Sequence, residues 1–251
     1  SHAFQKGKSI ITNANIHRNK RYVLNLDLKD FFDHFHFGRV RVFFMKNKNF
    51  ELPVGIATMI AQLTCYEGKL PQGAPTSPII TNLVCNILDM RLLKIAKKYR
   101  VVYTRYADDM TFSTNDKKFL ENQENFMKSI KKEIESFGFE INDKKTRLLF
   151  CDSRQEVTGL VVNKKISVNR EYCKRTRAMA DAFYRRGIFE ICGEEGSVNQ
   201  LEGRFSFINQ IDCYNNKNDR EQKHTFWTLN ARERQYQKFL FLIMNRCLTV
   251  R

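Results

Sequence analysis

The stretch RYADDMTF, residues 105–112, places two adjacent carboxylates, Asp108 and Asp109, between short apolar segments. Residues 101–106 and 110–112 favour strands, so the stretch predicts a β-hairpin with the aspartates at its turn. Turn chemistry alone is one explanation of such a pair. A metal site is the other, because two neighbouring carboxylates repel each other unless a cation compensates their charge, and Mg²⁺ takes oxygen ligands.

Outward from this stretch, strand-like and helical patterns alternate. Alternating apolar residues at 21–28 predict a strand, and the apolar spacing of 79–98, with basic residues near its end, predicts a long helix. Three of the four prolines lie in residues 70–78, which predicts a loop. The remaining patterns predict helices at 38–46 and at 119–137, the latter ended by Gly138, and strands with turns at 139–150 and 156–169.

A basic, helical part is predicted beyond Asn169. Helical patterns rich in Lys and Arg cover residues 171–186, 198–211 and 232–247. The change in composition near Asn169 therefore predicts a boundary between a mixed α+β body and a positively charged helical tail.

Composition narrows the class of partner. The 251 residues carry 43 Lys and Arg against 27 Asp and Glu, a net charge of +16, which favours a polyanion: nucleic acid first, an anionic membrane surface second. No apolar run approaches the ~20 residues that span a bilayer, and no signal-like segment begins the sequence. The seven cysteines show no metal-ligand spacing, which is typical of a reduced, cytoplasmic protein. Because Ser1 is not a start methionine, we expect the natural N-terminus to be missing.

A third carboxylate, Asp27, ends the strand-like segment. Asp30 and Asp33 follow it and are explained as charges at a helix start. If the strand lies beside the hairpin, Asp27 converges with Asp108 and Asp109. Three carboxylates can hold two Mg²⁺ about 4 Å apart, the arrangement used for in-line phosphoryl transfer.

The chain resembles reverse transcriptases in the order of their palm motifs, which here read LNLDLKDFF (24–32), LPQGAPTSP (70–78), YTRYADDMTFS (103–113), GFEINDKKT (138–146) and TGLVVN (158–163). Five motifs in this order are specific, and they cover most of the chain. Two further strings resemble hallmarks of bacterial retron reverse transcriptases, the NAxxH element as NANIH (13–17) and the VTG element at 157–159.

The resemblance implies an α+β, right-hand polymerase fold. Fingers would comprise residues 1–21 and 36–80, with their N-terminal part missing. A palm of antiparallel sheet plus helices would comprise residues 22–35 and 81–168 and carry the catalytic site. A helical thumb that binds RNA and DNA would comprise residues 169–251.

The resemblance also implies an RNA-directed DNA polymerase. Such an enzyme uses dNTPs and two Mg²⁺ to copy a structured non-coding RNA into branch-linked single-stranded DNA (msDNA). Synthesis starts from a guanosine 2′-hydroxyl, and the system acts in anti-phage defence beside an effector protein. The alternatives are a group II intron-like or other defence-associated reverse transcriptase, which NAxxH together with VTG disfavours, and an inactive nucleic-acid-binding scaffold, which the intact aspartates disfavour.

Catalytic roles carry over motif by motif. Asp27, Asp108 and Asp109 match the catalytic carboxylates and would ligate metal, with the Leu28 carbonyl as a further ligand. Lys145 matches the motif lysine, a candidate general acid for the leaving pyrophosphate. A solvated surface charge is the alternative for Lys145.

Nucleotide-binding roles carry over in the same way. Phe32 matches a bulky steric gate that clashes with a ribose 2′-hydroxyl, unless it is simply a core residue. Gln72 and Gly73 match a loop that contacts the incoming nucleotide and template, unless they form an ordinary proline turn. Tyr106 would support the sugar or the primer.

Recognition of RNA is assigned to the two retron hallmarks, namely Asn13, His17, Val157, Thr158 and Gly159. A structural role is the alternative for a lone histidine such as His17. Binding of the phosphate backbone is assigned to one face of the predicted helix after Asn169, formed by Arg170, Lys174 and Arg177. A merely solvated basic face is the alternative there.

Overall fold

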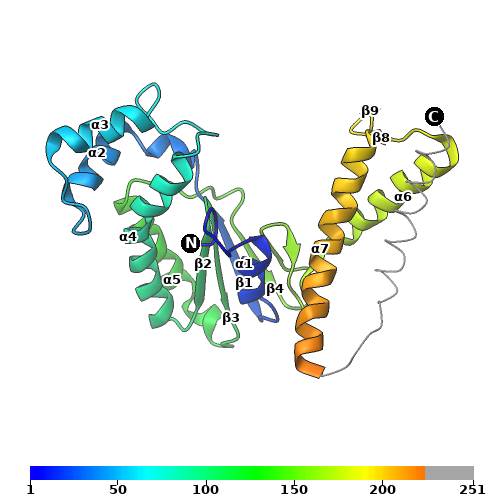
Figure 1. The fold of residues 1–251 in the computed structure, drawn as a ribbon. Coiled ribbons are helices and arrows are strands. Elements are labelled where there is room, and N and C mark those ends of the chain that lie inside the picture. The colour runs from blue at the N-terminus through cyan, green and yellow to red at the C-terminus, as the bar shows by residue number, and fades with distance from the viewer. Residues whose placement is uncertain (224–251) are drawn as a thin grey trace. The chain divides into compact units, whose positions relative to one another are not determined.

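The computed structural model describes residues 1–223, so the helix predicted at 232–247 lies outside the described residues. The chain divides into two compact units (Figure 1). The first comprises Ser1–Thr158 and Val162–Lys164, and the second comprises Gly159–Val161 and the residues from Lys165 on. Within the described residues, no helix combines the length and the apolar character that crossing a bilayer requires.

A four-stranded antiparallel sheet forms the centre of the first unit. Its strands are β1 (Tyr22–Asp27), β2 (Val102–Tyr106), β3 (Asp109–Thr114) and β4 (Arg147–Phe150), in the spatial order β2-β3-β1-β4. The strand predicted at 21–28 and the hairpin are confirmed. The strand pattern predicted over 139–150 is confirmed only for β4, although Ile141 forms an isolated bridge with Leu28.

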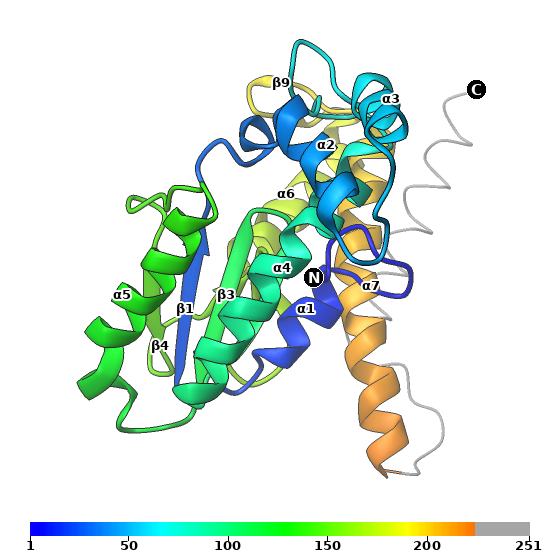
Figure 2. The ribbon, with the colours of Figure 1, turned by 90° about the vertical axis from the view of Figure 1, so that its left-hand side faces the viewer.

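Two helices, α4 (Ser77–Lys98) and α5 (Phe119–Ser136), pack on one face of this sheet (Figure 2). Phe112 of β3 contacts Phe126 of α5 edge to face, with ring centroids 5.4 Å apart. The fully buried side chains Leu26, Met110, Leu88, Leu92 and Ile130 belong to the same core. Both helices were predicted; α4 begins two residues earlier than expected, inside the predicted loop.

The opposite face of the sheet is more polar. Successive residues of a strand point to opposite faces, so Asn25 and Asp27 of β1 lie away from α4 and α5. The short helix α1 (Ile10–Ile16) lies on this polar face, because His17, which follows it, bonds Thr104 and Ser113 of the sheet. The acidic residues are therefore on a side of the sheet that the main core does not fill.

The segment between β1 and α4 contains the 3₁₀ turn η1 (Phe31–His34) and two helices, α2 (Phe37–Lys46) and α3 (Val54–Thr64). Helix α2 was predicted, whereas α3 was not. Only Ala57 and Ala61 of α3 are buried, so its larger apolar residues do not gather on one face and give no amphipathic signal.

The second unit combines short strands with two helices. Strand β6 (Leu160–Val161) pairs with β7 (Ser167–Val168), and β8 (Glu190–Ile191) pairs with β9 (Glu194–Glu195). Strand β5 (Glu156–Val157) belongs to the first unit. Helices α6 (Arg170–Arg186) and α7 (Val198–Lys223) share a small core of Ala180, Phe189, Leu201 and Phe205.

Helix α6 ends, as its sequence predicts, before Gly187, which adopts a φ of 82°. Helix α7 was predicted to end at residue 211 but continues to Lys223. Residues 214–223 are almost entirely polar, so they lack the apolar spacing on which the prediction depended. The β8–β9 hairpin between the two helices was not predicted.

Candidate active site

The antiparallel register of β1 and β3 places Asp27 directly opposite Asp109. Directly opposed residues on neighbouring strands project from the same face. Asp108 precedes β3, and its carbonyl accepts a hydrogen bond from the Leu28 N–H at 3.3 Å. The structure therefore brings Asp27 together with the aspartate pair, although the two segments are far apart in the sequence.

The aspartate pair is presented by a very tight turn. Because β2 and β3 pair Tyr106 with Asp109, only Ala107 and Asp108 form the loop between the strands. Ala107 has a φ of 56°, in the left-handed region that non-glycine residues rarely adopt. Asp108 thus stands in the turn, whereas Asp109 is the first residue of a strand.

A cavity of about 470 Å³ opens beside the turn. Its lining contains the predicted site residues Asp27, Leu28, Phe32, Gln72, Asp108 and Lys145. Sequence reasoning did not assign the other lining residues, Lys29, Asp30, Phe31 and Asn142, to the site. Of these, Asn142 contacts a predicted carboxylate, because its Nδ2 donates to Asp27 Oδ2 at 3.3 Å. Its presence within the motif GFEINDKKT, three residues before the predicted lysine, was the available signal.

Lys145 forms an ion pair with Asp27, with 3.1 Å between Nζ and Oδ2. The Asp27 side chain is 12% exposed, whereas that of Lys145 is 64% exposed. The hydrogen bond and the charge of Asp27 raise the pKa of Lys145. The ammonium group is therefore protonated at neutral pH and can move, because an exposed ion pair is weakly held.

The aspartates perturb each other. Burial, then the negative charges of Asp108 and Asp27, raise the pKa of Asp109 to about 6. Burial and the charge of Asp27 also raise the pKa of Asp108. Raised pKa values are expected where carboxylates lie close together with too little positive charge to compensate them.

Among residues 1–223, no three acidic, His or Cys side chains are arranged closely enough to hold a metal ion. The predicted magnesium site is therefore not present as a ready-made cluster in the described part of the chain. The donors still suit the ion, because Asp27, Asp108 and Asp109 supply hard carboxylate oxygens, and because burial and the negative charge of Asp27 raise the pKa of Asp108 and of Asp109.

Two of the four predicted nucleotide-binding residues, Phe32 and Gln72, line the cavity. Phe32 is half-buried against Phe31, with ring centroids 5.4 Å apart, and also lines the cavity. Gln72 lines the cavity, and Gly73 beside it has a φ of 89° with open space where a Cβ would stand. Glycine is thus needed there for its conformation, not for lack of room. Tyr106, at the end of β2, is half-buried.

The two predicted residues of the NAxxH hallmark, Asn13 and His17, lie in the interior, and the role in RNA recognition assigned to them stays a prediction. His17 is 0% exposed, and its Nδ1 and Nε2 lie 2.7 Å from Ser113 Oγ and Thr104 Oγ1, respectively. Burial lowers the pKa of His17 to about 3, so the ring is neutral. Asn13 is also buried. The structural alternative is the one that this geometry supports.

The VTG hallmark forms a turn. Val157 is 0% exposed, and the role in RNA recognition assigned to it stays a prediction. Thr158 and Gly159 follow with φ values of 47° and 79°. Two successive residues with positive φ are typical of the tight turns that join antiparallel strands.

A polar chain ties Glu156, the residue before the VTG hallmark, to the sheet. Asn25 Nδ2 donates to the carbonyl of Glu156 at 2.7 Å, and Thr111 Oγ1 donates to Asn25 Oδ1 at 3.1 Å. Asn25 and Thr111 are neighbours of Asp27 and Asp109 on the same face of the sheet. Glu156 is thus bonded to the face of the sheet that carries Asp27 and Asp109.

In the second unit, helix α6 presents the predicted basic face. Arg170, Lys174 and Arg177 are exposed, whereas Thr176 and Ala180 are buried. None of the three basic residues forms an ion pair with a described residue, in contrast to Arg175, which pairs with Glu171 at 2.6 Å. Their charges are therefore available to a polyanion.

Comparisons with known proteins agree with these observations. Residues 1–171 match the family model described as reverse transcriptase (RNA-dependent DNA polymerase). The chain is 36% identical over 210 residues to the retron Ec86 reverse transcriptase of Escherichia coli, covering 83% of this chain and 62% of that protein. It is 35% identical over 243 residues to the retron Mx162 reverse transcriptase of Myxococcus xanthus, covering 84% and 49%.

A further relative, the retron Ec73 reverse transcriptase of Escherichia coli, is 33% identical over 227 residues, covering 84% of this chain and 70% of that protein. The chain thus spans between about half and two thirds of the first two relatives. The family match also confirms the predicted α+β polymerase fold class. On its ordered motifs and these matches, the chain belongs to the reverse transcriptase family and, within it, to the bacterial retron reverse transcriptases.

Proposed function

We propose that this protein is the RNA-directed DNA polymerase of a retron. The observation that carries the proposal is the register that sets Asp27 opposite Asp109, with Asp108 in the adjoining turn at the edge of a cavity. Asp27, Asp108 and Asp109, with the Leu28 carbonyl, would hold two Mg²⁺. Bound there, the ions would activate the attacking hydroxyl and stabilise the leaving pyrophosphate.

The other residues of the cavity would bind and orient the nucleotide. Lys145 is protonated and would give its Nζ proton to the leaving pyrophosphate. Its ion pair with Asp27 must open for this to happen, which the exposed ammonium allows. Phe32 would exclude a ribose 2′-hydroxyl, and Gln72 and Tyr106 would support the base and sugar.

The template we propose is a structured non-coding RNA, copied from a 2′-hydroxyl primer into branch-linked msDNA. Support comes from the relatives, which are retron reverse transcriptases. We assign fingers to residues 1–21 and 36–80, palm to 22–35 and 81–168, and thumb to 169–251. We further propose a cytoplasmic role in anti-phage defence with an effector protein, on the same likeness alone.

The decisive experiment is Mg²⁺-dependent incorporation of dNTPs on a primed RNA template. Wild type should extend the primer, whereas Asp108→Ala combined with Asp109→Ala should not. Asp152→Ala, an exposed aspartate outside the cavity, is the matched control and should behave as wild type. Equal incorporation by wild type and the double variant would contradict the proposed enzyme and favour the alternative of an inactive nucleic-acid-binding scaffold.

The narrower proposal needs the natural product. Nucleic acid that copurifies with the active protein should contain RNA joined to DNA through a 2′-linkage, which resists an RNase that degrades linear RNA. An active polymerase that copurifies with linear RNA alone would favour the group II intron-like alternative.

A further inference from the structure

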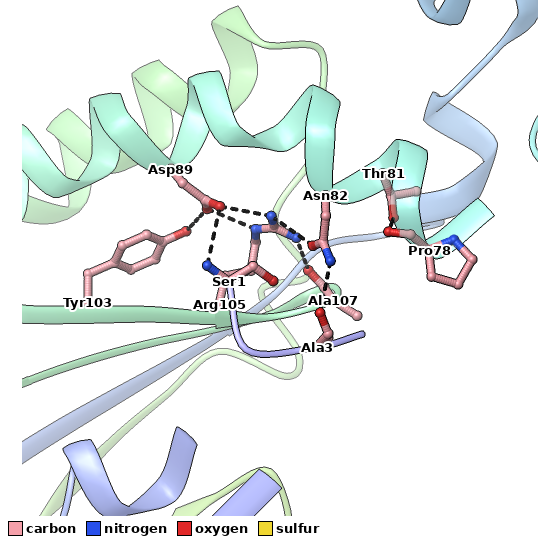
Figure 3. Close-up of polar contacts among 9 residues, drawn as sticks. All are labelled: Ser1, Ala3, Pro78, Thr81, Asn82, Asp89, Tyr103, Arg105 and Ala107. Carbon is pink, nitrogen blue, oxygen red and sulfur yellow. Dashed lines mark hydrogen bonds and ion pairs between the residues drawn. The ribbon is translucent and has the colours of Figure 1, made fainter. Parts of the chain in front are cut away.

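Arg105, on β2, is a fully buried cation whose position the polymerase mechanism does not explain. Its guanidinium is 0% exposed and makes a two-point contact with Asp89 of α4, with Nε–Oδ1 and Nη2–Oδ2 both at 2.8 Å (Figure 3). Burying an ion pair carries a large desolvation penalty, so such a pair adds little stability over apolar packing. The contacts of Arg105 beyond Asp89 indicate what else the buried pair can do.

The third contact of Arg105 leads to the aspartate turn. Nη1 donates to the carbonyl of Ala107 at 3.1 Å, and Nη2 also lies 3.4 Å from Asn82 Oδ1 (Figure 3). Ala107 is the residue of the turn with a φ of 56°. Strained backbone of this kind persists only where its surroundings hold it.

The turn is held from both sides. The carbonyl of Ala107 accepts from Arg105, and the carbonyl of Asp108 accepts from the Leu28 N–H at 3.3 Å. The first bond links the turn, through Arg105 and Asp89, to the long helix α4. The second links it to β1, which carries Asp27. Each carbonyl of the two-residue loop is thus fixed to a different rigid element.

We propose that Arg105 and Asp89 are positioning residues that hold the Ala107–Asp108 turn in the geometry required for nucleotidyl transfer. The role rests on the proposed polymerase function. Asp89 fixes the guanidinium by a two-point contact, and the guanidinium fixes the backbone of the turn. A lysine cannot reproduce this, because its ammonium is a point charge without the planar fork.

Arg105→Lys tests the role, with Tyr103→Phe as the matched control. Tyr103 donates its hydroxyl to the same carboxylate, Asp89 Oδ1, at 2.8 Å, on the side of Asp89 away from the turn (Figure 3). Both variants remove a buried hydrogen bond to Asp89, and only Arg105→Lys removes the support of Ala107. The readouts are kcat and KM for dNTP, the Mg²⁺ concentration at half-maximal rate, and the thermal midpoint.

For Arg105→Lys we expect kcat to fall about tenfold or more at temperatures well below its midpoint, because small displacements of reacting groups are costly. We also expect the Mg²⁺ requirement to rise and KM for dNTP to change less than kcat. Tyr103→Phe should lower the midpoint and leave kcat within about twofold of wild type. A folded Arg105→Lys with the kcat and Mg²⁺ requirement of wild type would overturn the inference.

If Arg105→Lys does not fold, Ala107→Gly tests whether catalysis depends on the conformation of the turn. This substitution leaves the buried ion pair and the Arg105 bond to the turn carbonyl intact, but glycine widens the range of backbone angles open to the turn, so kcat should fall while the midpoint does not. A kcat equal to that of wild type would overturn the need for a held turn. An inactive wild type would instead overturn the polymerase function itself, so the two failures are distinguishable.

Discussion

Lys145 Nζ lies 3.1 Å from Asp27 Oδ2, and Asn142 Nδ2 reaches the same oxygen at 3.3 Å. Both donors come from the short segment before β4, next to the point where Ile141 bridges Leu28. Two donors therefore converge on one oxygen of a carboxylate that we assign to metal binding, so a cation bound there would compete with the Lys145 ammonium for the charge of Asp27.

Replacement of Lys145 by alanine should reduce the rate of dNTP incorporation by about 100-fold or more, if Lys145 supplies the proton to the leaving group. Lys144→Ala is the control, because Lys144 is exposed and lies outside the cavity lining. Single-turnover kinetics at saturating dNTP would measure the chemical step. Equal rates for the two variants would return Lys145 to the role of a solvated surface charge.

Replacement of Phe32 by alanine should weaken discrimination against ribonucleotides by about 10- to 100-fold, because the ring that excludes the 2′-hydroxyl is removed. Phe32→Tyr keeps the ring and should retain discrimination. The measurement is the ratio of kcat/KM for dNTP and rNTP with each variant. If Phe32→Ala lowers the stability of the protein but leaves that ratio unchanged, the role of Phe32 is packing in the hydrophobic core.

The stability of the protein should depend on the protonation of His17. Its folded pKa of about 3 is below the ordinary value of 6.5, so the unfolded state binds the proton more readily. The contribution is complete above pH 6.5 and declines as the pH falls toward 3, by about 2 kcal/mol at pH 5.

His17→Gln removes this titration. Chemical denaturation at several pH values should therefore show a steeper loss of unfolding free energy between pH 7 and pH 5 for wild type than for His17→Gln. Parallel curves for the two proteins would contradict a buried neutral imidazole.

The basic face of α6 should control the salt dependence of nucleic-acid binding. Replacing Arg170, Lys174 or Arg177 singly by glutamine should reduce the slope of log K against log salt concentration by about 0.7 to 0.9 for each phosphate that the protein no longer neutralises. Arg185→Gln is the control, because Arg185 already pairs with Asp181 at 3.1 Å. Titration of a labelled primer–template would measure the slopes. Identical slopes for all four variants would indicate a merely solvated face.

The sequence by itself determined the local elements and the family. The hairpin around Asp108 and Asp109, the strand ending at Asp27 and the helices α4 and α6 were all predicted, because each has a strong period, cap or turn signal. The motif order identified the relatives. Helix α3 and the C-terminal end of α7 were not predicted, because neither stretch has apolar residues at the spacing of an amphipathic helix.

Only the tertiary structure decided which side chains meet. It buried His17 between Thr104 and Ser113, placed Asn142 on Asp27 and aimed the Arg105 guanidinium at the Ala107 carbonyl. Period and propensity indicate which face of an element is buried, but not what lies opposite it. That depends on strand register and helix packing, and a shift of one residue in the register of a strand would move its side chains to the other face of the sheet.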